Sequence, residues 1–245
     1  MKVVFLGATK GMGRSLSRLL AERGEQLFLL EHVPEQLERT ARDLEVRGAS
    51  GPVQTADCDL LHPETFAAAL DAADAALGDF DTVIVTAGLF GTQQQLEDDP
   101  DWAARVVTAN YANTVLFCEE ARRRLLTRGG GLLCVFSSVA GDRGRKTVIL
   151  YGSAKAGLSH YLEGLDHKFR AEGLKTVCVK PGFVKTGMTA GLKPPPFAGE
   201  PDDVARRVLK AIDRGRPVVY APPMWRLVMC VIRNLPRFVM RRINF

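Results

Sequence analysis

The sequence predicts a single-domain α/β fold in which a doubly wound parallel sheet of seven strands carries helices on both faces. Two observations lead to this prediction. Short apolar runs alternate along the chain with longer segments of helical periodicity, and the apolar runs are continuous rather than interrupted at every second position. Strands buried on both faces have such continuous runs, and regular alternation of strands and helices produces a parallel sheet with right-handed crossovers. We expect the strand order 3-2-1-4-5-6-7.

The elements follow from these runs in chain order. The predicted strands are Val3–Leu6, Gln26–Glu31, Val53–Ala56, Thr82–Thr86, Leu132–Ser137, Thr176–Lys180 and Val218–Tyr220. The predicted helices span residues 11–23, 34–46, 63–76, 100–127, 148–171 and 202–213. The Pro-rich segment Lys193–Phe197 indicates a loop or lid. Residues 1–222 form the main domain, and residues 223–245 form a basic amphipathic tail that Pro236 breaks or kinks.

Composition and charge exclude several classes of protein. The 245 residues are 46% hydrophobic and 25% charged, which is ordinary globular composition and excludes collagen-like or disordered chains. The net charge is +5, and the tail from Met224 to Phe245 holds five arginines and no acidic residue. The tail therefore carries the whole excess, which argues against a general nucleic-acid surface and against a nucleic-acid partner.

The cysteines and the apolar segments set further limits. The five cysteines are far apart, with no C-x-x-C pair and no His/Cys cluster, so we expect no metal site. Thiols inside apolar runs are typical of reduced core cysteines in a cytoplasmic protein. No stretch of about 18 uninterrupted apolar residues occurs, so we expect no membrane-spanning helix.

A glycine-rich turn follows the first strand and opens the first helix. Such a turn lets a dinucleotide pyrophosphate approach the helix N-terminus, although the same pattern also suits a purely structural turn. The turn residues expected to contact the cofactor are Gly7, Thr9, Lys10, Gly11, Met12 and Gly13. Glu31 ends the second strand, where a carboxylate binds ribose hydroxyls and repels a 2′-phosphate, so NAD(H) is favoured slightly over NADP(H). Lys10 would pair either with that phosphate or with Glu31 itself.

Ser138, Tyr151 and Lys155 form the strongest constellation. Tyr151 and Lys155 are four residues apart on a predicted helix and share one face, and Ser138 ends a strand thirteen residues before Tyr151. A nearby ammonium and an oxidised nicotinamide cation would lower the phenol pKa from about 10 toward the working range. Tyr151 would then exchange a proton with a carbonyl oxygen that Ser138 hydrogen-bonds. The alternative is a surface helix with an unrelated Tyr and Lys.

At these residues the chain resembles the short-chain dehydrogenase/reductase family over nearly its whole length. The resemblance implies a Rossmann fold and hydride transfer between a nicotinamide and a carbonyl or secondary alcohol. It implies that Asn110 supports a proton-relay water beside Ser138, Tyr151 and Lys155. Thr86 stands where the family usually has Asn. The further cofactor contacts that it implies, besides Tyr151 and Lys155, are Asp59, Leu60, Ala87, Gly88, Pro181, Gly182, Val184 and Thr186.

A narrower resemblance covers residues 137–145, 151–158, 181–188, 219–223 and 228–237. These segments are similar to the keto-reductase subunit of the decaprenylphosphoryl-ribose 2′-epimerase pair, which implies a lipid-linked substrate, a keto-sugar of a polyprenyl phosphate. Arg143, Arg145 and Lys146 follow Ser138 closely, so we expect them at the mouth of the site, where they would bind a phosphate. The alternative is a solvated basic loop without a ligand.

Two interpretations of the tail stay open. Residues 224–245 would lie on a membrane surface, making the protein peripheral at the inner face, or pack against a sister subunit in a homodimer or homotetramer. Two alternatives to an enzyme also remain, a catalytically silent nucleotide-binding regulator and a membrane-peripheral assembly subunit.

Overall fold

The computed structural model describes residues 1–243 and contains one parallel sheet of seven strands in the order β3-β2-β1-β4-β5-β6-β7. The predicted fold class and strand order are therefore confirmed. The strands are β1 (Lys2–Leu6), β2 (Gln26–Glu31), β3 (Gln54–Asp57), β4 (Thr82–Val85), β5 (Gly131–Phe136), β6 (Leu174–Pro181) and β7 (Val218–Ala221).

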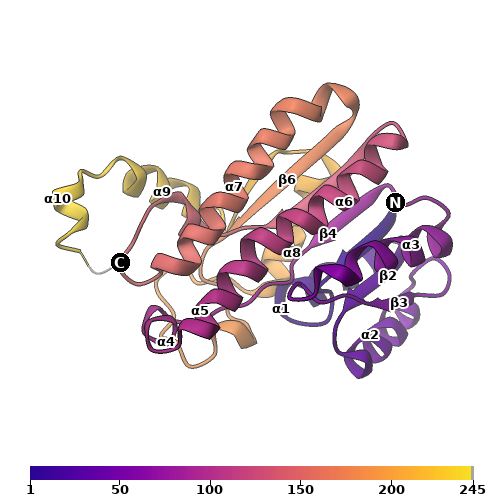
Figure 1. Cartoon of the computed structure of the whole chain (residues 1–245), viewed down its shortest axis with the longest axis horizontal. Coiled ribbons are helices and arrows are strands. Elements are labelled where there is room, and N and C mark those ends of the chain that lie inside the picture. Colours follow the sequence, from indigo (N-terminus) through magenta and orange to yellow (C-terminus); the bar gives the residue numbers. More distant parts are fainter. Residues whose placement is uncertain (244–245) are drawn as a thin grey trace.

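The helices cover both faces of this sheet (Figure 1). They are α1 (Gly11–Glu22), α2 (Pro34–Val46), α3 (Phe66–Leu77), α4 (Gln93–Asp98), α5 (Pro100–Val107), α6 (Thr114–Thr127), α7 (Ile149–Phe169), α8 (Pro201–Asp213), α9 (Met224–Asn234) and α10 (Arg237–Met240). Short turns of tighter or wider helix complete the chain: η1 (Pro63–Thr65), η2 (Thr108–Asn113), η3 (Val139–Asp142), η4 (Arg170–Glu172) and η5 (Gly187–Thr189).

Two hydrophobic cores lie on opposite faces of the sheet because successive strand residues point in opposite directions. In β1, Val3 and Phe5 join the core beneath α1, α2 and α8. Val4 and Leu6 join the core beneath α3, α6 and α7. Both faces are thus covered, which explains the continuous apolar runs in the sequence. The carboxyl ends of the strands stay at one edge of the sheet, where the predicted site residues follow them.

The structure differs from the predicted helices in two places: one predicted helix is divided, and one helix was not predicted. The helix expected over residues 100–127 is divided by the π-helix η2, in which Asn110 bonds outside the helix. Helix α4 is not among the predicted elements, because its polar sequence contributes one buried residue, Leu96. The lysine- and proline-rich segment at 193–197 is a loop, as expected, and leads into α8.

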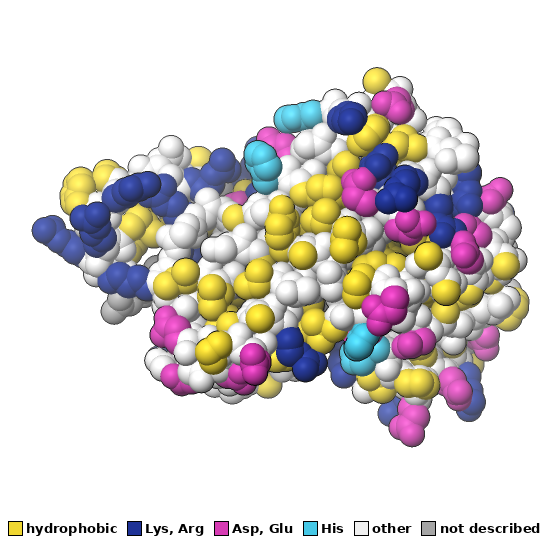
Figure 2. All heavy atoms as spheres, viewed as in Figure 1, with side chains coloured by type: hydrophobic (Ala, Val, Ile, Leu, Met, Phe, Trp, Pro, Cys, Tyr) yellow, Lys and Arg dark blue, Asp and Glu magenta, His cyan; other side chains and the backbone are white. Residues whose placement is uncertain are grey.

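The tail consists of two helices that stand out from one end of the molecule (Figure 1). Helix α9 ends before Pro236 and α10 follows it, so the predicted break is confirmed. Figure 2 shows arginine and hydrophobic side chains gathered on these helices. Within the described chain, no helix is both long and apolar enough to cross a bilayer. The last two residues of the predicted tail, 244 and 245, lie outside the described residues.

Candidate active site

The glycine-rich turn between β1 and α1 has a backbone that only glycine adopts easily. Gly7 has a φ of +94° and Gly11 a φ of +48°, both in the left-handed region. A Cβ on Gly13 would lie 2.1 Å from the Gly7 carbonyl oxygen, so strand and helix are too close for a side chain there. The N-cap residue of α1, Lys10, does not cap the helix with its side chain. The first main-chain N–H groups of α1 therefore suit an anion.

Thr86 holds this turn from the end of β4. Its Oγ1 donates a hydrogen bond to the Gly7 carbonyl oxygen at 2.7 Å, and its main-chain N–H donates to the Leu6 carbonyl oxygen at 2.9 Å. The threonine therefore supplies a contact between the two strand ends at the position where the resembled family usually has Asn.

Glu31 lies at the end of β2, beside the same turn. Its Oε2 accepts a hydrogen bond from Thr9 Oγ1 at 3.0 Å, and its Oε1 lies 2.9 Å from His32 Nδ1. Within residues 1–243 no ion pair joins Glu31 to Lys10, which is exposed. Of the two roles considered for Lys10, pairing with Glu31 is therefore not the one the structure adopts.

Asp59 and Leu60 follow β3, two strands away from β1 along the sheet. The Asp59 carboxylate accepts a hydrogen bond from the Leu61 N–H at 2.8 Å, and Asn113 donates to the Leu60 carbonyl oxygen at 2.7 Å. These bonds fix the segment at the same edge of the sheet as Glu31, which is where a dinucleotide's adenosine end would lie.

Ser138, Tyr151 and Lys155 come together where β5 ends and α7 begins. Ser138 is 8% exposed, and its Oγ accepts a hydrogen bond from the Ala140 N–H at 3.0 Å. Its Oγ also donates a hydrogen bond to the Pro181 carbonyl oxygen at 3.5 Å, and Ser138 acts to lower the pKa of the nearby Tyr151 phenol. One turn further along α7, Lys155 Nζ lies 5.8 Å from the centre of the Tyr151 ring. The shared face that the spacing predicts is thus present.

Burial shifts the pKa of both titratable groups of this site, the Tyr151 phenol and the Lys155 ammonium. Burial raises the pKa of Tyr151 to about 12, and Ser138 opposes this shift. Burial lowers the pKa of Lys155 to about 8. For the protein without cofactor, burial is the larger effect on the phenol, and the lowering expected from Lys155 together with an oxidised nicotinamide cation stays a prediction. Lys155 donates its hydrogen bond to the Phe136 carbonyl oxygen at 2.9 Å, and the loss of water around the phenol is the larger effect.

Asn110 is fully buried in the π-helix η2. Its Nδ2 donates to the carbonyl oxygens of Leu89, at 2.6 Å, and Val106, at 2.9 Å, and its Oδ1 accepts from the Leu89 N–H. This side chain therefore fixes the segment after β4 that contains Ala87 and Gly88. A Cβ on Gly88 would lie 2.5 Å from Asn110 Oδ1 and 3.7 Å from Lys155 Nζ. Gly88 therefore lies between the side chains of Asn110 and Lys155. The water that Asn110 is expected to hold for a proton relay stays a prediction.

The segment after β6 returns to the glycine-rich turn. Pro181 ends the strand, the Gly182 N–H donates to the Ala221 carbonyl oxygen at 3.0 Å, and Val184 is buried. A Cβ on Gly11 would lie 3.2 Å from Thr186 Cγ2. A cavity of about 750 Å³ lies between this segment and α1, lined among others by Gly11 and Thr186.

These residues fit a dinucleotide. The left-handed glycines, the uncapped start of α1 and the close approach of Thr186 to Gly11 together form a cradle that a side chain would fill. Glu31 and Asp59 would meet the adenosine end, and Lys155 with the segment 181–186 would meet the nicotinamide end. Within residues 1–243, no group of three or more His, Cys, Asp or Glu is arranged to hold a metal ion.

Asp142, which the sequence analysis did not select, ties three segments together. It lies in η3, four residues after Ser138, and its side chain is 2% exposed. Its carboxylate accepts hydrogen bonds from Lys180 Nζ at 2.6 Å and from the Tyr220 hydroxyl at 2.7 Å. Arg233 of α9 lies close enough to the Tyr220 phenol to act on its pKa. An acidic residue just after Ser138, in an otherwise basic loop, was the available signal.

The basic loop after Ser138 contacts the tail. Arg143 donates to the Leu235 carbonyl oxygen at 2.9 Å, and Lys146 donates to the Arg241 carbonyl oxygen at 2.7 Å. Arg145 is half-buried, and the loss of water around its guanidinium lowers its pKa. The charged groups of Arg143 and Lys146 thus meet the carbonyl oxygens at the ends of α9 and α10, and their binding of a substrate phosphate stays a prediction.

The tail packs directly on the segment expected to receive the nicotinamide. Trp225 is 5% exposed and clusters with Val139, Met229 and Ile232. A Cβ on Gly182 would lie 2.0 Å from Trp225 Nε1. The residue after Pro181 must therefore be glycine for α9 to occupy this position.

On the opposite side, α4 and the segment before it cover Tyr151. The Phe90 ring meets the Tyr151 ring edge to face, with centroids 5.2 Å apart. Gln93 Oε1 accepts hydrogen bonds from the first N–H groups of α7, at 2.7 Å from Ile149 and 3.3 Å from Leu150. These two residues, also not foreseen, position the start of the helix that carries Tyr151.

Comparisons with known proteins agree with this geometry. The short chain dehydrogenase family matches residues 1–196. An oxidoreductase of Streptomyces coelicolor is 36% identical over 251 residues, covering 98% of this chain and 95% of that protein. One from Mycobacterium tuberculosis is 34% identical over 240 residues, covering 98% and 96%.

Solved structures show the same fold. A short-chain type dehydrogenase/reductase from Mycobacterium ulcerans superposes with a TM-score of 0.80 at 22% identity, over 89% of this chain and 87% of that one. An actinorhodin polyketide ketoreductase with NADPH gives 0.80 at 21% identity, over 89% and 95%. The family match, the two bacterial relatives and the Ser–Tyr–Lys site lead to one conclusion: this chain belongs to the short-chain dehydrogenase/reductase family of NAD(P)-dependent oxidoreductases.

Proposed function

We propose that this chain reduces a carbonyl compound with a nicotinamide cofactor, Tyr151 supplying the proton and Ser138 holding the carbonyl oxygen. The observation that carries this proposal is the position of Tyr151 beside Ser138 and Lys155. Ser138 acts to lower the pKa of the phenol, and Lys155 Nζ lies 5.8 Å from the centre of its ring. A relative from Danio rerio, 29% identical over 217 residues, is named carbonyl reductase family member 4, which supports a carbonyl substrate.

The mechanism follows from these contacts. The bound nicotinamide supplies the hydride. Ser138 Oγ and the Tyr151 hydroxyl both hydrogen-bond the substrate oxygen, and Tyr151 delivers its proton there as negative charge develops. Because burial raises the pKa of Tyr151 to about 12, the phenol stays protonated at neutral pH, as a proton donor must. Lys155 stays close to the phenol and stabilises the phenolate that remains.

The test is the Tyr151→Phe variant with a panel of ketones. Loss of the hydroxyl should lower turnover by about 10²–10⁴-fold, whereas the dissociation constant for the cofactor, measured by nucleotide fluorescence, should change little. A variant that retains wild-type turnover rejects the role given to Tyr151. A wild-type chain that binds nucleotide but reduces no ketone favours the silent-regulator alternative.

For the cofactor we propose NAD(H). Glu31 is held at the end of β2 by Thr9 and His32, and its carboxylate would repel a 2′-phosphate. Comparison of kcat/KM with NADH and NADPH decides the matter. A tenfold preference for NADPH overturns the proposal and assigns the exposed Lys10 to the phosphate.

For the substrate we propose a lipid-linked carbonyl, with a polyprenyl-phosphate keto-sugar as the narrower candidate from the sequence resemblance. The basic loop gives no support, because Arg143 and Lys146 hold the tail. Support comes from the exposed apolar side of the tail, where Leu227 and Val231 are each 64% exposed and Phe238 is 60% exposed. Higher kcat/KM for ketones with long alkyl chains is expected, and equal values for short and long ketones refute this choice.

The same apolar side would place the tail on an anionic membrane surface, since arginines flank it. A Leu227→Glu, Val231→Glu variant should lose binding to phosphatidylserine-containing vesicles. If the variant instead changes the oligomer mass and leaves vesicle binding unchanged, the tail packs against a sister subunit in a homodimer or homotetramer.

A further inference from the structure

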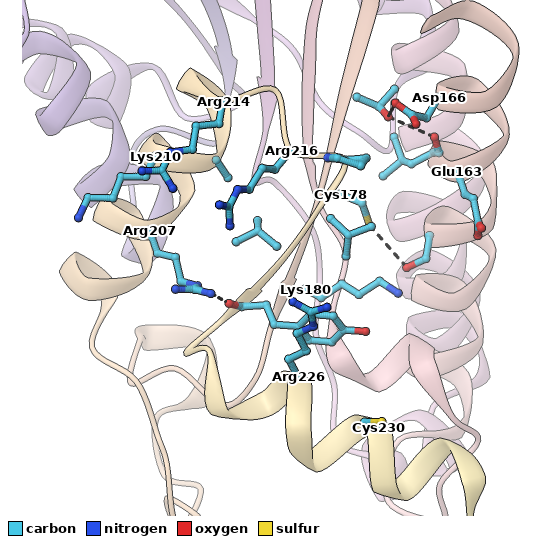
Figure 3. Close-up of a pocket in the computed structure, with 18 of the residues that line it drawn as sticks. Glu163, Asp166, Cys178, Lys180, Arg207, Lys210, Arg214, Arg216, Arg226 and Cys230 are labelled. Carbon is cyan, nitrogen blue, oxygen red and sulfur yellow. Dashed lines mark hydrogen bonds between the residues drawn. The ribbon is translucent and has the colours of Figure 1, made fainter.

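A second cavity lies at the open edge of the sheet, away from the cofactor cradle. It has a volume of about 1000 Å³ and is bounded by α7, α8, α9 and the edge strand β7 (Figure 3). None of its lining residues lines the cavity beside the glycine-rich turn. Two acidic side chains, Glu163 and Asp166 of α7, line one wall. Seven cationic side chains line the rest: Lys180, Arg207, Lys210, Arg214, Arg216, Arg226 and Arg233.

Among the described residues, four of these seven cations have no protein partner for their side chains. Lys180 is paired with Asp142, Arg207 donates to the Tyr220 carbonyl oxygen at 2.7 Å, and Arg233 interacts with the Tyr220 phenol. Within residues 1–243, no hydrogen bond or ion pair engages the side chains of the other four, all exposed: Lys210, Arg214, Arg216 and Arg226. The Asp166 carboxylate on the facing wall is already paired with Arg170. Uncompensated cations that share a concave surface raise the local positive potential and favour an anion there.

Helix α9 is built to present its cations to this cavity. Its residues divide into three faces. Trp225, Met229 and Ile232 are buried against the domain. Met224, Leu227 and Val231 form an exposed apolar face. Arg226, Cys230 and Arg233 point to the cavity. Figure 3 shows Arg226 rising from α9 beside Lys180, with Arg216 projecting into the open volume and Lys210 and Arg214 on the opposite helix.

The edge strand itself is unsuited to pairing with another strand. Along residues 217–221, the carbonyl oxygens of Pro217 and Ala221 accept hydrogen bonds from Cys178 and Gly182 of the β6 side. Because carbonyl groups alternate in direction along a strand, the Tyr220 carbonyl oxygen points away from β6. Arg207 already occupies that oxygen. A second copy of the chain at this edge would also bring two basic cavities together. A small anionic ligand meets neither obstacle, and the volume suits one.

We propose that this cavity binds a small molecule carrying two or more phosphate groups, at a site separate from the cofactor cradle. Guanidinium groups bind phosphate oxygens through paired N–H donors, and Arg214, Arg216 and Arg226 offer three of them from different elements. The cavity therefore matches a compact ligand with several charged oxygens better than one with a single carboxylate. The binding is independent of the proposed reduction.

The test uses inorganic pyrophosphate and isothermal titration calorimetry on the full chain at low salt. Wild-type protein should bind with a submillimolar dissociation constant that weakens as salt is added. Arg216→Gln with Arg226→Gln should weaken binding at least tenfold. The matched control, Arg39→Gln with Arg42→Gln on exposed positions of α2, removes the same charge and should bind as wild type does. Thermal unfolding of each variant checks its fold.

Two further arms sharpen the result. Lys210→Gln with Arg214→Gln, in α8 and directly after its last residue, should weaken pyrophosphate binding in the same way. Acetate should bind at least tenfold more weakly than pyrophosphate. Adenosine diphosphate, titrated with the same variants, shows whether a nucleoside adds affinity at this site. Equal pyrophosphate affinity in wild type and both cavity variants overturns the proposal, as does absence of binding to wild type. Neither result depends on turnover, so failure here is distinct from failure of the proposed reduction.

Discussion

Removal of the Asp142 carboxylate should destabilise the protein far more than removal of an equally close but exposed partner. Asp142 lies 2.6 Å from Lys180 Nζ, with side-chain exposures of 2% and 13%. Asp71 lies 2.6 Å from Arg124, but it is 70% exposed and Arg124 keeps two other acidic partners. Breaking a buried pair costs about 3–5 kcal/mol because the remaining charge stays buried, whereas an exposed pair contributes about 0–1 kcal/mol.

Differential scanning calorimetry of Asp142→Ala and Asp71→Ala measures this contrast. For a chain of this size, each kcal/mol shifts Tm by about 2–4 °C, so Asp142→Ala should lower Tm by about 6–20 °C and Asp71→Ala by less than about 4 °C. Asp142→Asn, which keeps an acceptor for Tyr220, should fall between them. Because Asp142 holds Tyr220, whose phenol lies beside Arg233 of α9, Asp142→Ala should also speed proteolysis within the tail. Equal Tm values for the two alanine variants would refute the assignment of a buried, structural ion pair to Asp142.

Three more predictions concern the site. Burial lowers the pKa of Lys155 from 10.5 to about 8, so between these pH values the unfolded chain binds more protons than the folded one and the contribution of Lys155 to stability should rise with pH. The Tm difference between wild type and Lys155→Met should therefore move in favour of wild type from pH 8 to pH 10. A constant difference contradicts the pKa shift. Gly182→Ala should displace Trp225 and expose the tail to protease, whereas Gly187→Ala, with no atom within 4 Å of the new Cβ, should not; equal cleavage would disprove the tight contact. Thr86→Val should cost about 1–3 kcal/mol by leaving the Gly7 carbonyl oxygen without its partner, while Thr86→Ser should restore most of it in urea unfolding.

Much of the fold was predictable because the strands are apolar on both faces. The runs at β1, β2 and β5 identify buried strands without any tertiary information, and α2 lies over the residues predicted for it. Helix α4 escaped prediction, since a six-residue polar helix with Leu96 as its buried contact has no periodic signal. The division of the 100–127 helix depends on the Asn110 amide bonding Leu89, a contact between segments that periodicity does not encode.

The site shows the same division between local and distant causes. The spacing of Tyr151 and Lys155 places them on one helix face whatever surrounds them, so sequence sufficed. The direction of Arg143 and Lys146 depends on carbonyl oxygens about ninety positions later in the chain. The sequence shows that cations follow Ser138 in a loop. It does not show which oxygens they bond, because these acceptors belong to the folded tail. The same reasoning explains why Asp142 was overlooked.

The π-helix at residues 108–113 makes the spacing between α5 and α6 sensitive to a single residue. Because each residue of an α-helix turns by about 100°, deletion of one position on either side of this turn, with the wide turn itself kept, would rotate α6 by that angle against α5. Phe117, Ala121 and Leu125, now buried against the sheet, would turn toward water. Homologous chains should therefore vary in length at their loops and hardly at all along this stretch, which gives a way to recognise the wide turn in related sequences without a structure.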